Sequence, residues 1–405
     1  MNVILISTIR PERTTAAALT LHRHLVDKPE IALSVLPGEP HELKTGQFWT
    51  KTVPRLRKTR FHRWIADAEL LAHPRGRLHR RLPEPAELFG NSNGELRPGS
   101  PNGSSQRHDT VVLTLAYGNG CWIARNYARR HGLPLLVRFD DWWPDIAAVH
   151  QLMRPYLQRK FVELHKSATV SICVSEGMKA ALGPHPDAVV VLPIPDANAA
   201  IAATAPPSAP PLRVCYLGNM YDYGPMLAGL ADRSRAQSDI RIEFRGPEPR
   251  WPDTLKQTMR QEGLLHGFAD GPEYQKWFES FHAYLVAMFF EPEQRRRVET
   301  CFATKLVEYA KLGRPIVLWA PESASVVQWA TRTKAALCVT DPNPEALLEA
   351  LRKLAGNPRE QEQLGILARR AYETDFAAER LQNTFLAALR RAPQNHDRQH
   401  HHRAS

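Results

Sequence analysis

Short apolar runs alternate with longer stretches of mixed polarity from one end of the chain to the other. Apolar runs bounded by turn residues predict buried strands, and apolar residues that recur at helical spacing predict amphipathic helices. This alternation is typical of parallel sheets covered by helices, so we predict an α/β protein. The predicted strands are 2–7, 31–36, 110–115, 134–139, 170–174 and 188–192, followed by 212–217, 240–245, 283–288, 315–319 and 335–339.

A segment rich in Ala and Pro separates the two groups of strands. Residues 196–211 read D-A-N-A-A-I-A-A-T-A-P-P-S-A-P-P, which suits an interdomain linker better than a core element. A chain of 405 residues is also too long for one ordinary core. We therefore predict two Rossmann-like domains, 1–195 and 212–375, facing each other across a cleft that holds the substrates.

Three further segments complete the predicted organisation. Residues 83–108 are dense in Pro, Gly, Asn and Ser and predict a mobile insertion in the first domain. Residues 376–391 contain one more amphipathic helix. Residues 392–405, which include three consecutive histidines, lack apolar periodicity and predict a disordered tail rather than a metal tract.

Composition points to a cytoplasmic protein. The first predicted strand begins next to the initiator Met, and no apolar run approaches the ~20 residues of a membrane span. Five cysteines stand singly, without the paired spacing of zinc or redox sites, so we expect reduced core residues.

The net charge of +11 is concentrated in residues 51–81, which hold ten Lys or Arg residues and two acidic residues. Phe61, Trp64 and Ile65 recur there at roughly helical spacing, so a basic amphipathic helix is predicted. This helix is either a solvated face or a surface for an anionic membrane or a polyanionic acceptor. No nucleic-acid motif accompanies it, and we expect no nucleic acid as a partner.

The most informative stretch is 302–319, F-A-T-K-L-V-E-Y-A-K-L-G-R-P-I-V-L-W. Residues 303–312 predict a helix that Gly313 ends and Pro315 cannot prolong. Thr304, Lys305 and Glu308 share one face near its N-terminus, where free amides and the helix dipole favour a phosphate. A carboxylate beside that phosphate can accept both hydroxyls of a ribose. The alternative is a surface helix whose Lys and Glu form an ordinary pair.

This stretch resembles the K-L-x-E-Y-x-x-x-G-x-P-V-V segment of GT-B glycosyltransferases, particularly glycosyltransferase family 4 and its relatives. The resemblance implies that Glu308 holds the ribose and that amides of residues 301–304 hold the diphosphate. The donor-binding residues implied in this loop are Thr300, Cys301, Phe302, Ala303 and Thr304. It also implies that the last helix crosses back onto the first domain. Thr300 stands where many members carry a second glutamate.

The segment 133–145, L-P-L-L-V-R-F-D-D-W-W-P-D, places carboxylates where a strand ends. It resembles the D-x-W-P loop of family 4-like enzymes, so we expect Asp141 to position sugar or acceptor, roofed by Trp142 and Trp143. Buried tryptophans at a capped helix start are the alternative. No D-x-D triplet occurs, and we predict no metal and no cofactor beyond the nucleotide sugar.

The donor turn of the second domain departs from the family pattern. In the segment 214–220, V-C-Y-L-G-N-M, the resemblance implies that Gly218 and Asn219 face the donor phosphates, but the arginine and lysine usual in the family after this glycine are absent. A departing diphosphate needs fixed positive charge. Candidate substitutes are Lys305, which has the best placement, Arg245, Arg295, Arg296, Arg297, Arg10 and Arg13.

Two smaller motifs complete the candidate site. The segment 264–270, L-L-H-G-F-A-D, resembles the loop that brackets the donor base, so backbone groups around His266 and Phe268 are expected to read the base edge. In 171–179, S-I-C-V-S-E-G-M-K, we expect Ser175 to cap a helix.

The resemblance thus implies a metal-independent retaining glycosyltransferase that moves a sugar from a nucleoside diphosphate to a glycan or lipid-linked acceptor, and we expect Asp141 and Lys305 to be its catalytic residues. Two alternatives remain open. One is a nucleotide-sugar epimerase on the same fold, and the other is a catalytically silent homologue that acts as a binding module.

Overall fold

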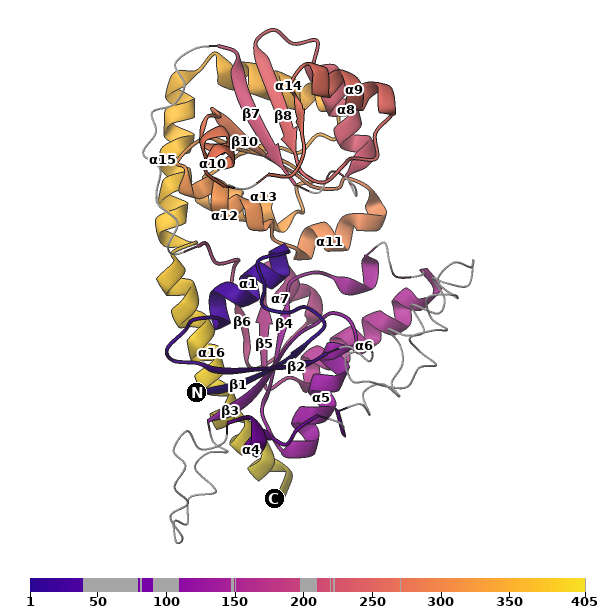
Figure 1. Ribbon diagram of the computed structural model, residues 1–405, viewed down its shortest axis with the longest axis vertical. Helices are drawn as coiled ribbons and strands as arrows, with labels where there is room; N and C mark the ends of the chain where they lie inside the picture. The colour runs from indigo at the N-terminus through magenta and orange to yellow at the C-terminus, as the bar shows by residue number, and fades with distance from the viewer. Residues whose placement is uncertain are drawn as a thin grey trace. The chain divides into compact units, whose positions relative to one another are not determined.

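The computed structural model describes residues 1–38, 79–80, 82–89, 109–146, 149, 151–196, 210–218, 220, 223–269 and 271–404, with side chains as far as 396. The chain divides into two compact units (Figure 1). Unit 1 comprises Met1–Ile194 and Glu379–Ser405, and unit 2 comprises Pro195–Ala378. Each unit is an α/β domain with its own parallel sheet, as the alternating pattern predicts.

Unit 1 is built on a six-stranded parallel sheet in the order β2-β1-β3-β4-β5-β6. Its strands are β1 (Asn2–Ser7), β2 (Ala32–Pro37), β3 (Thr110–Leu115), β4 (Leu135–Phe139), β5 (Val170–Cys173) and β6 (Ala188–Val190). Its helices are α1 (Ala16–Leu25), α4 (Pro85–Leu88), α5 (Gly120–His131), α6 (Arg154–Ser167) and α7 (Glu176–Leu182), with 3-10 turns η2 (Trp143–Asp145) and η3 (Gln151–Met153). The central strands are buried on both faces, which explains their continuous apolar runs.

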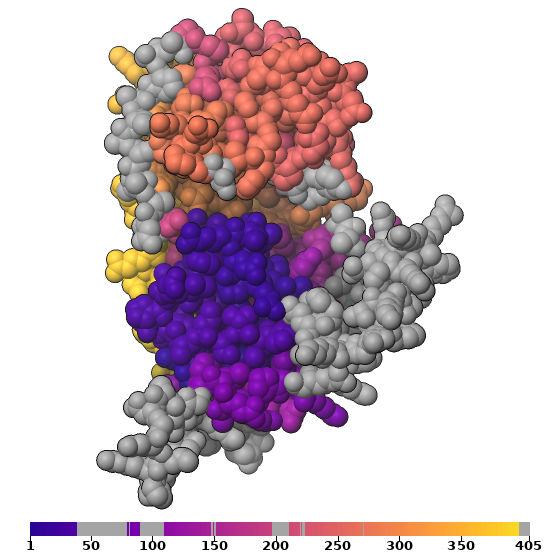
Figure 2. Space-filling model, viewed as in Figure 1, coloured from indigo at the N-terminus to yellow at the C-terminus, as the bar shows by residue number. Residues whose placement is uncertain are grey.

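Side-chain caps fix where two of these helices begin. The Thr15 hydroxyl accepts from Ala18 N at the start of α1. The Ser175 hydroxyl accepts from Met178 N at 2.9 Å, which confirms the predicted cap of α7. In Figure 2 the N-terminal segment of unit 1 (indigo) forms a continuous part of the visible surface.

The C-terminal helix α16 (Ala378–Ala404) belongs to unit 1 from Glu379 onward. The His24 ring of α1 stacks on Phe385 with centroids 4.3 Å apart, and its Nδ1 donates to Gln382 Oε1 at 2.9 Å. Buried Leu381 and Leu389 continue this contact face, since they lie at helical spacing from Phe385.

Residues 392–404 are helical, so the expectation of a disordered tail is wrong over this range. Ala392 and Asn395 are buried, and His396 Nε2 donates to Gly132 O at 3.1 Å. Pro393 lies within the helix. Packing against unit 1 therefore outweighs the low apolar content that suggested disorder.

Unit 2 has a second six-stranded parallel sheet, in the order β12-β11-β10-β7-β8-β9. Its strands are β7 (Leu212–Leu217), β8 (Ile240–Arg245), β9 (Leu265–His266), β10 (Ala283–Ala287), β11 (Ile316–Trp319) and β12 (Leu337–Val339). Its helices are α8 (Gly224–Ser234), α9 (Asp253–Gln261), α10 (Gly271–Glu279), α11 (Arg295–Thr300), α12 (Thr304–Lys311), α13 (Ser325–Thr333), α14 (Pro344–Ala355) and α15 (Pro358–Thr374), with the 3-10 turn η4 (Pro292–Gln294).

Several expectations fall on residues outside the described ranges. These are most of the linker, the basic segment except residues 79–80, and the insertion except its first residues, where α4 forms. Among the residues described, no helix has the length and apolar character required to cross a membrane.

Candidate functional site

Two backbone turns of unit 2 approach each other at the carboxyl ends of β7 and β8. Gly218 N donates to Arg245 O at 3.0 Å, and a Cβ added at Gly246 would lie 2.1 Å from Gly218 O. Gly218 also has a φ of +151°, a conformation that side chains disfavour. The backbone of Gly246 therefore passes directly against that of Gly218, and a side chain at position 246 would collide with it. Asn219 lies outside the described residues.

Lys305 directs its ammonium group at this turn from α12. A Cβ added at Gly218 would lie 2.5 Å from Lys305 Nζ, so glycine leaves the space that the ammonium occupies. Across the described part of the chain, no carboxylate forms an ion pair with Lys305. Burial lowers the pKa of the Lys305 ammonium to about 8, although the Cys215 thiol acts in the opposite direction. Such a half-buried, unneutralised cation is suited to an anionic ligand.

The N-terminus of α12 adds backbone donors beside this lysine. Ala303 is the N-cap residue, and no side chain caps the helix. Within the described ranges, the backbone N–H groups of residues 302–305 make no hydrogen bond. Four such groups together with the helix dipole provide positive potential for a phosphate.

Three residues just before α12 have groups that are already engaged elsewhere. The Cys301 amide donates to Arg297 O at 2.8 Å and closes α11, so it does not join the free donors at α12. The Thr300 side chain is buried and donates to Arg296 O at 2.8 Å. The ring of Phe302 is buried against Trp329 and Phe376. The Thr300 hydroxyl and the Cys301 amide are therefore not available for the donor-binding roles expected of these residues.

Tyr309 fixes the distance between α12 and the end of β7. Its hydroxyl accepts from Leu217 N at 3.1 Å, and its ring stacks on Tyr284 with centroids 4.8 Å apart. The Gly218 turn and the helix that carries Lys305 are thus held by one hydrogen bond in the core. Sequence reasoning did not assign this role, although Tyr309 is the tyrosine of the quoted E-Y pair.

Helix α10 contributes the aromatic side chains of Tyr274 and Trp277, neither of which the sequence analysis assigns to the site. Burial raises the pKa of the Tyr274 hydroxyl to about 12, and the Cys215 thiol and Glu308 carboxylate act in the same direction while Arg245 opposes them. Glu308, which contributes to this shift, is half-buried on α12. No family motif covers α10, so only a three-dimensional arrangement could reveal this neighbourhood.

Arg245 lies at the end of β8, and its guanidinium group already contacts neighbouring aromatic rings and a backbone carbonyl. Its guanidinium carbon lies 4.1 Å from the centroid of the Trp277 ring and 5.9 Å from that of Tyr274. Its Nη1 donates to Gly267 O at 3.2 Å, which ties the arginine to the loop after β9. Arg245 is therefore a cation on an aromatic platform that also anchors residues 267–269.

The His266 side chain belongs to a buried polar cluster. Glu243 Oε2 accepts from His266 Nε2 and from Trp277 Nε1, both at 3.1 Å, and Arg213 binds Oε1 at 2.8 Å. Burial opposes ionisation of Glu243, but hydrogen bonds from His266 and Arg213 outweigh it and lower the pKa of this carboxyl to about 2. The imidazole is thus a structural group. Phe268, on the loop beyond it, is 82% exposed.

The remaining candidate cations are less well placed. Arg295 pairs with Glu299 at 2.7 Å, and Arg297 lies over the Phe289 ring at 5.4 Å. Arg10 and Arg13 belong to unit 1 and follow β1. Lys305 is the candidate whose cationic group the structure brings within reach of the Gly218 turn.

Asp141 follows β4 in unit 1 and is exposed, whereas its neighbour Asp140 forms an ion pair with Arg138 at 2.8 Å. Burial raises the pKa of Asp140 despite this arginine, and the Asp141 carboxylate adds to the effect. Trp142 and Trp143 are buried, with the Trp142 ring edge-on to Phe161 at 5.1 Å. The expectation that these rings roof a sugar is therefore wrong, because both complete the core behind the loop.

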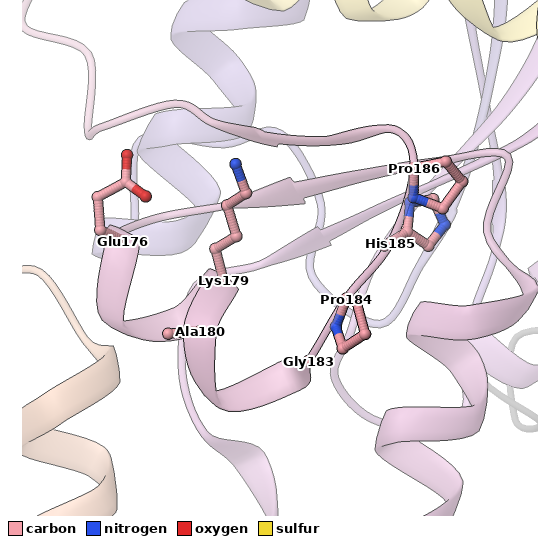
Figure 3. A pocket seen from close by; sticks show the side chains of 7 residues that line it. All are labelled: Glu176, Lys179, Ala180, Gly183, Pro184, His185 and Pro186. Atoms are coloured by element: carbon pink, nitrogen blue, oxygen red, sulfur yellow. The ribbon is translucent and has the colours of Figure 1, made fainter.

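A separate pocket of about 650 Å³ lies along α7 in unit 1 (Figure 3). Its lining is Glu176, Lys179, Ala180, Gly183, Pro184, His185 and Pro186. Both nitrogens of the His185 ring are engaged, with Ala168 O and Asp187 N each at 3.0 Å. None of the residues assigned from the sequence to the donor site lines this pocket. A search of the described residues for three or more clustered metal-ligating side chains finds none.

The sequence matches no model of a known protein family and no curated protein. Its structure is similar to that of Anabaena Alr3699/HepE in complex with UDP-glucose, with 11% identity, a TM-score of 0.61, and coverage of 96% of this chain and 99% of that one. It is also similar to the trehalose-6-phosphate synthase OtsA, with 12% identity, a TM-score of 0.59, and coverage of 96% and 99%. A third similar structure is the UDP-forming α,α-trehalose-phosphate synthase of Burkholderia xenovorans in complex with glucose-6-phosphate, with 13% identity, a TM-score of 0.60, and coverage of 96% and 100%. The chain therefore has the fold of the GT-B glycosyltransferases.

Proposed function

We propose that this protein is a glycosyltransferase that binds a nucleoside-diphosphate sugar in unit 2. The observation that carries the proposal is the placement of Lys305 Nζ against the Gly218 turn, beside the uncapped N-terminus of α12. A cation and converging amides are the donors that a diphosphate requires. The arginine and lysine that the resemblance places after Gly218 are missing, and Lys305 supplies positive charge to the same turn from another helix.

Lys305 would act on the leaving group. Cleavage of the bond between the sugar and the diphosphate transfers negative charge to the diphosphate, and a preorganised ammonium stabilises that charge in the transition state. Because the pKa of Lys305 is about 8, its side chain is protonated in most molecules at pH 7. A bound diphosphate would favour the protonated form further, since an opposite charge raises the pKa of a lysine.

The rest of the donor would be bound by neighbouring groups of the same unit. Glu308, one turn beyond Lys305 on α12, would accept hydrogen bonds from the ribose hydroxyls. Arg245 would add positive charge beside the diphosphate, and its Nη1 would stay bound to Gly267 O. Backbone groups near His266 and Phe268 would bind the base. The names of two similar structures include UDP, which makes uridine the first base to test.

The finer features of the reaction are proposed from the resemblance. Transfer would retain the anomeric configuration and need no metal, because the helix terminus and Lys305 provide the positive charge. Asp141 would position sugar or acceptor. The acceptor would be a glycan or a lipid-linked glycan of cell-surface polysaccharide synthesis, with the basic segment 51–81 holding the protein at the inner face of the membrane.

Calorimetric titration with UDP-glucose, UDP and GDP tests the donor site directly. We expect binding to the wild type and at least about tenfold weaker binding to Lys305→Met, the loss of one charged hydrogen bond. Lys353→Met is the matched control, because that exposed lysine of unit 2 pairs with Glu349 on α14. Equal affinity of the two variants and the wild type would contradict the proposal.

Product analysis then separates transfer from the two alternatives. Incubation with nucleotide sugar alone would reveal an epimerase, and binding without turnover across a broad acceptor panel would indicate a silent homologue. Release of nucleoside diphosphate that depends on acceptor is the result expected of a transferase.

A further inference from the structure

One carboxylate in the interior of unit 2 accepts hydrogen bonds from two separate groups of residues. The side chain of Glu243, on β8, is 4% exposed. Its Oε1 atom accepts from the guanidinium groups of Arg213 and Arg241, at distances of 2.8 to 3.2 Å. Its Oε2 atom accepts from Trp277 Nε1 and His266 Nε2, both at 3.1 Å. The two oxygens therefore hold different parts of the unit.

The Oε1 side of Glu243 belongs to the scaffold of the sheet. Arg213 of β7 also donates to Ser280 O at 3.3 Å, and its guanidinium carbon lies 4.5 Å from the centroid of the Phe281 ring. Arg241 also donates to Gly263 O at 3.1 Å. These contacts join β7 and β8 to the segments before β10 and β9, and none of them involves a residue assigned to the donor site.

The Oε2 side leads to the donor site through a closed chain of contacts. The guanidinium carbon of Arg245 lies 4.1 Å from the centroid of the Trp277 ring, and Arg245 Nη1 donates to Gly267 O at 3.2 Å. Gly267 directly follows His266, whose ring is bound to the same Oε2 atom as Trp277. The contacts thus return to Glu243, and displacement of one member requires the others to move.

Strand geometry explains how one carboxylate reaches both the tryptophan and the loop. Glu243 and Arg245 are two residues apart on β8 and therefore lie on the same face of the sheet. Trp277, on α10, contacts both of them. The loop 267–269 is anchored at its first residue by Arg245, whereas Phe268 beyond it is 82% exposed. The position of this loop therefore depends on the residues that fix Arg245 and His266.

We propose that Glu243 is a positioning residue that fixes Arg245 and the loop 267–269 and thereby sets which nucleoside base the donor site accepts. The inference rests on the proposed function, because that function assigns the base to this loop. Glu243 acts through Trp277 and His266 and not by contact with the donor. A loop held in one conformation presents a fixed set of backbone donors and acceptors, and a base of the wrong pattern leaves some of them unpaired.

Trp277→Phe tests this role, because it removes the hydrogen bond to Oε2 and keeps an aromatic ring at the position beside Arg245. Calorimetric titrations with UDP and GDP give the ratio of the two affinities for each protein. We expect the wild type to bind one nucleotide at least about tenfold more tightly than the other, the effect of one hydrogen bond to a charged group. In Trp277→Phe the two affinities should differ by less than about threefold, as expected when the hydrogen bond that fixes the loop is lost.

Glu243→Gln provides a second test of the same role. An amide offers one acceptor oxygen where the carboxylate offers two, so this variant cannot serve both the arginines and the pair Trp277 and His266. It should lose base discrimination as Trp277→Phe does. Thermal unfolding of each variant shows whether it is folded, and Trp277→Phe keeps the inference testable if Glu243→Gln does not fold.

Arg241→Gln is the matched control, because it removes a donor from the other oxygen of the same carboxylate. We expect this variant to keep the wild-type ratio of affinities. Lys305→Met should weaken binding of both nucleotides by a similar factor and leave the ratio unchanged, because Lys305 acts on the diphosphate that both nucleotides carry.

The outcomes separate the role of Glu243 from the proposed function. The role is overturned if Trp277→Phe keeps the wild-type ratio, if Arg241→Gln loses it to the same extent, or if the wild type binds UDP and GDP equally. Absence of any nucleoside-diphosphate binding by the wild type contradicts the proposed function, and the role of Glu243 falls with it.

Discussion

Lys305 links a local feature of the sequence to a testable electrostatic effect. Its ammonium is half-buried without an ion-pair partner in the described ranges, and its pKa is lowered to about 8 from 10.5. Only the protonated form attracts a diphosphate, so donor affinity should fall as pH rises through about 8. Titrations from pH 6.5 to 9.5 should show this decrease in the wild type and a flatter profile in Lys305→Met. A decrease of the same size in both proteins would assign it to another group.

The same lowered pKa has the opposite consequence for folding. Between pH 8 and 10.5 the unfolded chain binds more protons at this lysine than the folded chain does, so this group makes stability rise with pH. Relative to Lys305→Met, the wild type should therefore gain unfolding free energy across this range. Denaturant unfolding at several pH values measures the difference, and a relative loss would contradict the assigned direction.

Glu308 provides the second test at the residue scale. Glu308→Ala should leave the ribose hydroxyls without their acceptor and weaken donor binding by about 1.5–3 kcal/mol, the range for hydrogen bonds to charged groups. The wild type should also bind a 2′,3′-dideoxy nucleotide more weakly than the ribose form, and the variant should lose this discrimination. Glu322→Ala, at an exposed position of the same unit, is the control. Retained discrimination in Glu308→Ala would remove the ribose assignment.

Residues near the donor turn show the limits of reading motifs. The sequence placed Lys305 and Glu308 on one helix face because their spacing is local. It could not show that the Cys301 amide closes α11 or that Thr300 is buried, since both depend on where a six-residue helix ends. Tyr274 and Trp277 were missed for a related reason, because α10 meets the carboxyl end of β8 only in three dimensions.

At the scale of elements, the strands were predictable because burial on both faces imposes continuous apolar runs. Strand β9 has only two residues and is absent from the predicted strands, because its segment 264–270 was matched to the loop that brackets the donor base. The burial of Trp142 and Trp143 was harder to predict, since a tryptophan beside a carboxylate suits a sugar site and a core equally well. The predicted C-terminal helix ends at residue 391 and is shorter than the observed one, because a few buried contacts beyond that residue decide its length.

The contact between α1 and α16 predicts an acid-sensitive helix. His24 is fully buried, and burial together with the nearby Arg138 lowers its pKa to about 3, although the bond to Gln382 opposes this shift. Below pH 6.5 the unfolded chain binds a proton that the folded chain excludes, so stability falls as pH falls, by up to about 1.4 kcal/mol per pH unit, until pH reaches about 3. His24→Leu should unfold with a smaller loss between pH 6.5 and 4.5. An unchanged pH dependence would show that His24 does not carry this effect.

For the whole molecule, the absence of a D-x-D triplet leads to a prediction about metal ions. Lys305 and the amides of α12 provide positive potential without an ion, so excess chelator should leave sugar transfer intact. Abolition of transfer by chelator, followed by recovery with Mn²⁺ or Mg²⁺, would contradict this mechanism. Donor titration with and without chelator shows whether any metal effect acts on binding or on the chemical step.

The net charge of +11 leads to the last prediction, because much of it lies in residues 51–81. Ten cationic side chains beside Phe61, Trp64 and Ile65 should attract anionic lipid and insert apolar groups, with each charge near the surface contributing ~1 kcal/mol. Exposed charges are screened beyond a Debye length of ~8 Å at physiological ionic strength, so binding should weaken as salt rises.

The variant for this test has Arg57, Lys58, Arg60 and Arg63 changed to Gln, and flotation with anionic vesicles should be weaker for it than for the wild type. If these changes do not alter flotation, the segment is a solvated surface, and a soluble glycan becomes the better candidate for the acceptor.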